Sequence, residues 1–176
     1  MALKGLYIED DQSNLIVNSK LFRQEGFDIT YLPQLPQNID ELYPMVMEYR
    51  PDFLLIDHEL NKLTGYTGYD ALTEIRKHDR TIYAILLTNY KMEDYTDEFG
   101  AYDLQVHKSE LSSDEKLSEI ASKIHRACER SADLSVLAQL DEVRRLEEEK
   151  LTLLRQIHQS IQDKGAFCGG ERPLVR

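Results

Sequence analysis

The chain has 176 residues, which fits one ordinary domain with an appendage, because single domains cluster near about 100 to 150 residues. Its composition, with 41% hydrophobic and 30% charged residues, predicts a soluble globular protein and argues against a membrane protein. The net charge of −11 argues against a nucleic-acid-binding protein, since Lys and Arg supply most of the affinity for a phosphate backbone.

We expect neither a membrane span nor a signal peptide. No uncharged apolar run approaches the ~20 residues that cross a bilayer, and the N-terminal sequence MALKGLYIEDD has acidic residues where a signal peptide is apolar. The two cysteines, Cys128 and Cys168, are too few for a disulfide framework or a zinc cluster. These features predict a cytoplasmic protein in reducing surroundings.

Short apolar runs alternate with longer helical patterns through the first 130 residues. The run FLLI at 53–56 is too short and too continuous for anything but a buried strand, and the helix before it must end ahead of Pro51. Apolar residues recur with a period of 3.6 in the helical segments. In chain order we predict a strand at 3–8, a helix at 14–24, a strand at 27–32, a helix at 39–49, a strand at 53–56, a helix at 69–77, a strand at 82–87, a helix near 92–99, a strand at 104–106 and a helix at 111–129.

Five strands that alternate with five helices predict an α/β fold with a doubly wound, five-stranded parallel sheet. Right-handed crossovers then place helices on both faces of the sheet. In such sheets the ligand site lies outside the carboxyl ends of the strands.

Polar side chains follow four of the five predicted strands. They include acids, a hydroxyl and a lysine: Glu9, Asp10 and Asp11 after the first strand, Asp57 after the third, Thr88 after the fourth, and His107 and Lys108 after the fifth. Each alone would be read as a turn, packing or surface residue. Their shared placement at one edge of the sheet favours a functional site.

Carboxylates packed close together repel one another unless a cation neutralises them, and oxygen ligands suit Mg²⁺. Asp57 would stand at the tip of a buried strand, with the metal beside it and the ammonium of Lys108 opposite. This arrangement predicts phosphoryl transfer to the Asp57 carboxylate, with Thr88 donating a hydrogen bond to the incoming group.

Residues 1–130 also resemble a response-regulator receiver domain, similar to the single-domain chemotaxis regulator and flavodoxin-like in fold. The resemblance is carried by LYIEDD, FLLID, GYDALTEIR, AILLT and the lysine that follows FGAYDLQVH. It implies that a histidine kinase or a phosphotransfer protein donates a phosphoryl group to Asp57. It also implies that Mg²⁺ is held by Glu9, Asp10, Asp57 and the backbone carbonyl of Glu59, and that Thr88 and Lys108 read the phosphate.

Three departures from the family pattern concern signalling rather than chemistry. Leu60-Asn61 replaces the usual Met-Pro, in a loop that carries an insertion of about three residues. Ser109 follows the lysine where the family has a cis-proline. Gln105 stands where the family has a switch aromatic, so Tyr102 or Tyr90 would have to substitute.

Residues 133–163 contain neither proline nor glycine and predict a helix of about 30 residues. Their apolar residues recur with spacings of 4, 3, 3, 5, 3, 3 and 4, which predicts a coiled coil with one stutter: Val136, Leu140, Val143, Leu146, Leu151, Leu154, Ile157 and Ile161. A parallel homodimer is the first expectation. Docking onto another helical protein, or a lone helix continuing from 111–129, are the alternatives.

The predicted organisation is therefore a receiver domain at 1–130, a long helix at 131–164, and a flexible glycine- and proline-containing tail at 165–176. We expect a phosphorylated signalling switch in a two-component phosphorelay that acts through protein contacts, not an enzyme, with no nucleic-acid or membrane partner. A phosphate-independent pseudo-receiver scaffold or dimerisation adaptor is the alternative. An enzyme acting on a diffusible substrate is disfavoured, because no glycine-rich phosphate loop or second nucleophile is visible.

Overall fold

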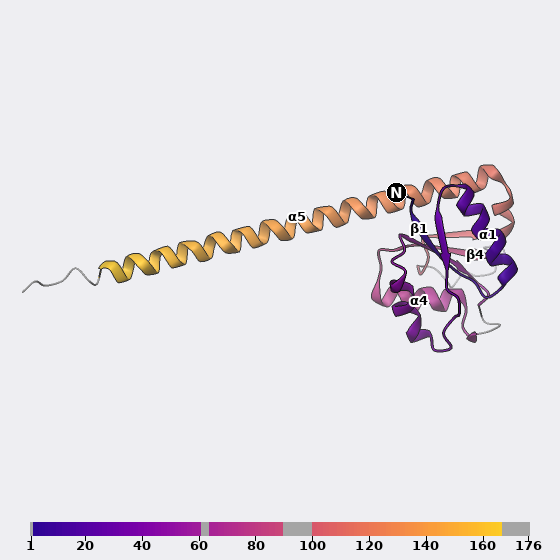
Figure 1. Ribbon diagram of the computed structural model, residues 1–176, viewed down its shortest axis with the longest axis horizontal. Helices are drawn as coiled ribbons and strands as arrows, with labels where there is room; N and C mark the ends of the chain where they lie inside the picture. The colour runs from indigo at the N-terminus through magenta and orange to yellow at the C-terminus, as the bar shows by residue number, and fades with distance from the viewer. Residues whose placement is uncertain (1, 61–63, 90–99, 167–176) are drawn as a thin grey trace, which may run out of the picture. The chain divides into compact units, whose positions relative to one another are not determined.

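The structure is a computed structural model that describes residues 2–60, 64–89 and 100–166 (Figure 1). Its sheet has the strand order β2-β1-β3-β4-β5, and every neighbouring pair is parallel. The predicted doubly wound parallel sheet is thereby confirmed. The strands are β1 (Lys4–Ile8), β2 (Asp28–Tyr31), β3 (Phe53–Asp57), β4 (Tyr83–Thr88) and β5 (Leu104–His107).

The helices largely follow the predicted segments, and local side chains fix where they begin. Asp11 caps the first helix by accepting hydrogen bonds from the backbone amides of Ser13 and Asn14. Thr67 and Asp70 form a reciprocal capping box at the start of another. The helices are α1 (Gln12–Gln24), η1 (Ile39–Glu41), α2 (Leu42–Glu48), α4 (Gly68–His78), η3 (Lys108–Ser112) and α5 (Asp114–Ala166).

Four helix predictions differ from the structure or lie outside the residues that it describes. The helix expected at 39–49 opens with the separate 3-10 turn η1. The helices expected at 111–129 and 133–163 are a single element, α5, preceded by η3. Residues 130–132 contain no helix breaker, so the backbone hydrogen bonds continue through them. The helix expected near 92–99 lies outside the described residues.

Helices cover both faces of the sheet and give it two cores (Figure 1). Buried residues of α2 and α4 pack against one face, with Leu54 and Ile56 of β3. Buried residues of α1 and of the first turns of α5 pack against the other, with Phe53 and Leu55. Because β3 contributes to both cores, all five of its residues are buried.

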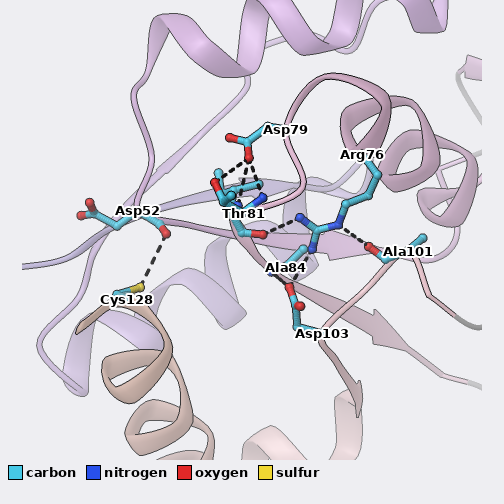
Figure 2. Close-up of polar contacts among 9 residues, drawn as sticks. Asp52, Arg76, Asp79, Thr81, Ala84, Ala101, Asp103 and Cys128 are labelled. Carbon is cyan, nitrogen blue, oxygen red and sulfur yellow. Dashed lines mark hydrogen bonds and ion pairs between the residues drawn. The ribbon is translucent and has the colours of Figure 1, made fainter. Parts of the chain in front are cut away.

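The chain divides into two compact units, Met1–Ser131 and Ala132–Arg176. Within the first unit, α5 is held by buried residues such as Leu117 and Ile124, and the thiol of Cys128 lies 3.5 Å from the backbone carbonyl oxygen of Asp52 (Figure 2). Every described side chain from 131 to 158 is exposed. No helix in the described part of the chain is long and apolar enough to cross a membrane.

Arg76 ties α4 to the beginnings of β4 and β5 (Figure 2). Its guanidinium donates to the carbonyl oxygens of Ala101 (2.9 Å) and Ile82 (2.6 Å) and to Oδ2 of Asp103 (2.7 Å). The same Asp103 oxygen accepts from the backbone amide of Ala84 at 2.8 Å. One side chain thus satisfies several backbone groups at the sheet end opposite the carboxyl termini of the strands.

Replacing Arg76 with Gln should lower the free energy of unfolding by about 1 to 3 kcal/mol, because two partly buried carbonyl oxygens lose their donors. Urea unfolding measures the change. The control is Arg80→Gln, since the Arg80 side chain is exposed and near the same turn. Equal stability of the two variants would contradict the assigned role of Arg76.

Candidate functional site

The register of the strands brings the predicted acids to one edge of the sheet. Ile8 of β1 pairs with Ile56 of β3, so the residues that follow, Glu9 and Asp57, leave neighbouring strands at the same level. Glu9 and Asp57 are 5% and 3% exposed. One carboxylate oxygen each from Glu9, Asp10 and Asp57 lies within 4.8 Å of the others. The structure therefore brings these three carboxylates together.

Lys108, the first residue of η3, reaches back to two of these acids. Its Nζ lies 2.7 Å from Oδ1 of Asp57 and 3.0 Å from Oε2 of Glu9. The three side chains are each 10% exposed or less, so the charges interact in a medium of low dielectric constant. The ammonium of Lys108 thus lies next to the Asp57 carboxylate, as the sequence predicts.

Thr88 is the last residue of β4 and is 1% exposed. It pairs with His107 of β5, and the preceding residue, Leu87, pairs with Asp57. Thr88 therefore ends its strand beside the strand that carries Asp57, at the same edge of the sheet.

Gly68 brings the first turn of α4 directly against Asp57. A Cβ atom at this position would lie 1.9 Å from the backbone carbonyl oxygen of Asp57, so no larger residue fits without movement. The amide of Gly68 donates to the carbonyl oxygen of His58 at 2.8 Å. This close approach explains why glycine begins α4 and shows how the loop after β3 is held.

A buried hydrogen-bond chain that the sequence did not reveal holds Glu9. The hydroxyl of Tyr7 donates to Oε2 of Glu9, and Nδ2 of Asn18 donates to the Tyr7 oxygen, both at 2.9 Å. Burial and the charge of Glu9 raise the pKa of Tyr7, so it remains a donor. In the sequence, the only sign of this hydrogen-bond chain was the hydroxyl of Tyr7 between the buried aliphatic residues Leu6 and Ile8.

The model of a family described as response regulator receiver domain matches residues 6–110, more than half of the chain. The chain belongs to this receiver family. Comparison with curated protein sequences gives no match.

Solved structures of receiver domains share the fold at low sequence identity. A CheY-like receiver domain from Methylobacillus flagellatus is 18% identical, with 70% of this chain and 99% of that chain covered and a TM-score of 0.56. Response regulator protein TrrA from Thermotoga maritima, in complex with Mg²⁺ and BeF, is 22% identical, with coverages of 70% and 99% and a TM-score of 0.54. TrrA in complex with histidine kinase ThkA is 24% identical, with coverages of 70% and 98% and a TM-score of 0.56.

This receiver domain holds the loop after β5 with a histidine. No peptide bond among the described residues is cis, including the one before Ser109. Nδ1 of His107 lies 2.7 Å from Oγ of Ser109 and accepts from the Ser109 amide at 3.2 Å, while Nε2 lies 2.9 Å from the carbonyl oxygen of Asn89. Since that carbonyl can only accept, Nε2 carries the proton. His107 thus links the loop that carries Lys108 to the residue after Thr88.

Tyr102, which lies near Gln105 at the position of the switch aromatic, is held by a hydrogen bond and by packing. The hydroxyl of Tyr102 donates to Oε1 of Gln105 at 2.9 Å, and its ring packs partly buried against the core on the α2 and α4 face. Tyr90, the other substitute considered, lies outside the described residues. Glu59 follows the buried His58, and its role as a backbone ligand stays a prediction.

The electrostatics of the receiver site favour a bound cation. Burial raises the pKa of Asp57 to about 7; Glu9 acts in the same direction, while Lys108 opposes it. Burial would lower the pKa of Lys108, but its hydrogen bond to Asp57 and the charges of Asp57 and Glu9 outweigh this and raise it. Three carboxylates facing one ammonium leave an excess of negative charge. Their hard oxygen donors fit Mg²⁺.

In Mg²⁺-free buffer, Asp57→Asn should stabilise the protein by about 1 to 3 kcal/mol at pH 8 and by less at pH 5. The folded state holds a proton on Asp57 between its ordinary pKa of 3.8 and about 7, where the unfolded chain has lost it. The native protein therefore loses stability as pH rises through that window, and the asparagine variant is spared this loss.

Thermal unfolding at both pH values measures the difference. Asp28→Asn is the control, since Asp28 is an exposed acid at the other end of the sheet. A gain that does not depend on pH, or one that the control shares, would contradict the assignment to Asp57.

Proposed function

We propose that this chain is a two-component response regulator that accepts a phosphoryl group on Asp57 in an Mg²⁺-dependent manner. A histidine kinase or a phosphotransfer protein would be the donor, and the output would be a protein–protein contact in the cytoplasm, without DNA binding. The observation that carries the proposal is the buried Asp57 carboxylate at the tip of β3, which lies against Lys108 and beside Glu9 and Asp10.

The reaction is a transfer between two side chains. A carboxylate oxygen of Asp57 attacks phosphorus, the phosphorus–nitrogen bond of the donor phosphohistidine breaks, and the histidine nitrogen keeps the electron pair. The product is an aspartyl phosphate. Held by Glu9, Asp10, Asp57 and the carbonyl of Glu59, Mg²⁺ would neutralise charge on the transferred group.

The residues around Asp57 would supply a counter-charge, a hydrogen-bond donor and a fixed metal ligand. Lys108 already pairs with the carboxylate, so its ammonium lies where a phosphoryl oxygen would need a counter-charge. Thr88 is a hydroxyl donor at the end of the next strand. Glu9 accepts a hydrogen bond from Tyr7, which holds its carboxylate beside the other proposed metal ligands.

Two neighbours in fold support the ligand and the donor by analogy. TrrA has been solved with Mg²⁺ and BeF, and also with the histidine kinase ThkA. We extend both properties to this chain, because its receiver domain presents an acidic cluster of oxygen donors next to the acceptor.

Phosphorylation would bias a two-state equilibrium of the loops after β4 and β5. New contacts from the phosphoryl group to Thr88 and Lys108 supply the energy difference. The hydrogen bond from His107 to the carbonyl of Asn89 connects the two loops, so they would move together.

A phosphate-independent scaffold is the second candidate. It is favoured by the Tyr102–Gln105 hydrogen bond, because an aromatic ring held in this way has lost the freedom to switch. In that case the receiver fold would only present the long helix to its partner.

Incubation with a small phosphodonor and Mg²⁺ should add one phosphoryl mass to the protein, and Asp57→Ala should abolish the gain. Omission of Mg²⁺ should reduce it. Mass spectrometry of the intact chain is the measurement, and Asp28→Ala is the control that should still be modified. An unmodified wild-type chain would support the scaffold.

Lys108→Ala should retain Mg²⁺ binding but respond poorly to phosphate, because the ammonium contacts Asp57 and is not a metal ligand. Titration calorimetry measures the Mg²⁺ affinity, and hydrogen exchange across 100–112 with and without BeF measures the response. The control Lys116→Ala removes an exposed lysine of α5 and should behave like wild type. A full BeF response in Lys108→Ala would contradict the assigned role.

A further inference from the structure

The second unit of the chain exposes a continuous apolar stripe. Six residues of α5 between 140 and 157 form it, and each is between 48% and 59% exposed: Leu140, Val143, Leu146, Leu151, Leu154 and Ile157. An amphipathic helix gains most of its stability from covering such a stripe. The stripe therefore needs a partner surface.

The stripe is symmetric about a point between Glu148 and Glu149. Leu140 and Ile157 lie at equal distances along the chain from this point, as do Val143 and Leu154, and Leu146 and Leu151. Read in either direction, these six positions have the same spacing, whereas Leu153, which is 58% exposed, has Arg144 at its mirror position. A different partner protein would not require this symmetry, and neither would a parallel pair of identical chains, whereas an antiparallel two-fold contact between identical chains does.

The charged residues at the middle of the stripe distinguish a parallel from an antiparallel pair of helices. With Leu140 at position a of a heptad, Val143 is at d, Glu147 at a and Lys150 at d. In a parallel, in-register pair each residue faces its own copy, so Glu147 would face glutamate and Lys150 would face lysine. In an antiparallel pair centred at the symmetry point, Glu147 of each chain faces Lys150 of the other.

On the outer face of this helix, Arg145 is already paired with two glutamates of the same chain. Arg145 lies 2.7 Å from a carboxylate oxygen of Glu142 and 2.8 Å from one of Glu149. Glu147 and Lys150 make no ion pair in the part of the chain that the structure describes. The two charges on the apolar face are thus available to a second helix.

We propose that α5 pairs with α5 of a second copy of this chain in antiparallel orientation, centred between Glu148 and Glu149. The apolar layers are Leu140 against Ile157 and Val143 against Leu154, and two Glu147–Lys150 ion pairs form the centre. This orientation replaces the parallel pair expected from the apolar spacing alone. The proposal rests on the proposed output through protein contacts, but not on phosphorylation.

Charge exchange tests the ion pairs in the full-length protein by sedimentation equilibrium. Glu147→Lys and Lys150→Glu should each weaken the dimer roughly tenfold or more, because two attractive contacts become repulsive. The double exchange should restore the wild-type dissociation constant. Glu148→Lys makes the same charge change outside the seam and should have little effect. Single variants that leave the dimer unchanged, or a monomeric wild-type chain, would overturn the proposal.

Disulfide crosslinking tests the orientation independently, in a chain with Cys128→Ser and Cys168→Ser. In the antiparallel pair, position 140 lies about 25 Å along the axis from its own copy and opposite 157. Leu140→Cys and Ile157→Cys should therefore crosslink when mixed, and neither should crosslink alone. Self-crosslinking of either single variant would indicate a parallel pair and overturn the proposal, as would the absence of any crosslink.

These results are separable from those on phosphate transfer. The mass gain on Asp57 reports on the receiver site, whereas sedimentation and crosslinking report on the helix. A chain that is phosphorylated but monomeric would overturn the helix pairing alone. A chain that crosslinks as expected but is never phosphorylated would overturn the proposed function alone.

Discussion

The rest of the structure depends on keeping several carboxylates close together at the buried edge of a sheet. Asp57 and Glu9 are almost inaccessible to water, so their mutual repulsion is weakly screened. Lys108 offsets only part of this repulsion. The fold tolerates the arrangement because each acid stands at the end of a rigid strand and cannot move away. That same excess of charge is what makes the edge a site for a cation.

Neighbouring residues hold the acids in a defined geometry despite their mutual repulsion. Gly68 lets the first turn of α4 close against the Asp57 carbonyl, and Tyr7 fixes the Glu9 carboxylate through a buried hydroxyl. His107 links the end of β5 to Asn89, the residue that follows β4. At two departures from the family pattern, Gln105 and Ser109, the structure has local hydrogen bonds with Tyr102 and His107.

The two units of the chain differ in how they are stabilised. The receiver unit covers both faces of its sheet and buries its own apolar residues. The described residues of the second unit all belong to α5, and their apolar stripe is about half exposed. A helix of this kind owes little to tertiary contacts of its own, so the pairing proposed above would add to its stability. In the proposed pair, Glu147 and Lys150 favour the antiparallel over the parallel orientation.

The sequence by itself determined the alternation of strands and helices, because buried parallel strands and amphipathic helices leave distinct periods. It also determined which ends of the strands carry Asp57 and Lys108, since all parallel strands end at one edge. Only the tertiary structure decided that Tyr7 contacts Asn18 and that His107 contacts Asn89, because these pairs come from different segments that pack together. It also decided that α5 continues without a break, which helix propensity alone leaves open.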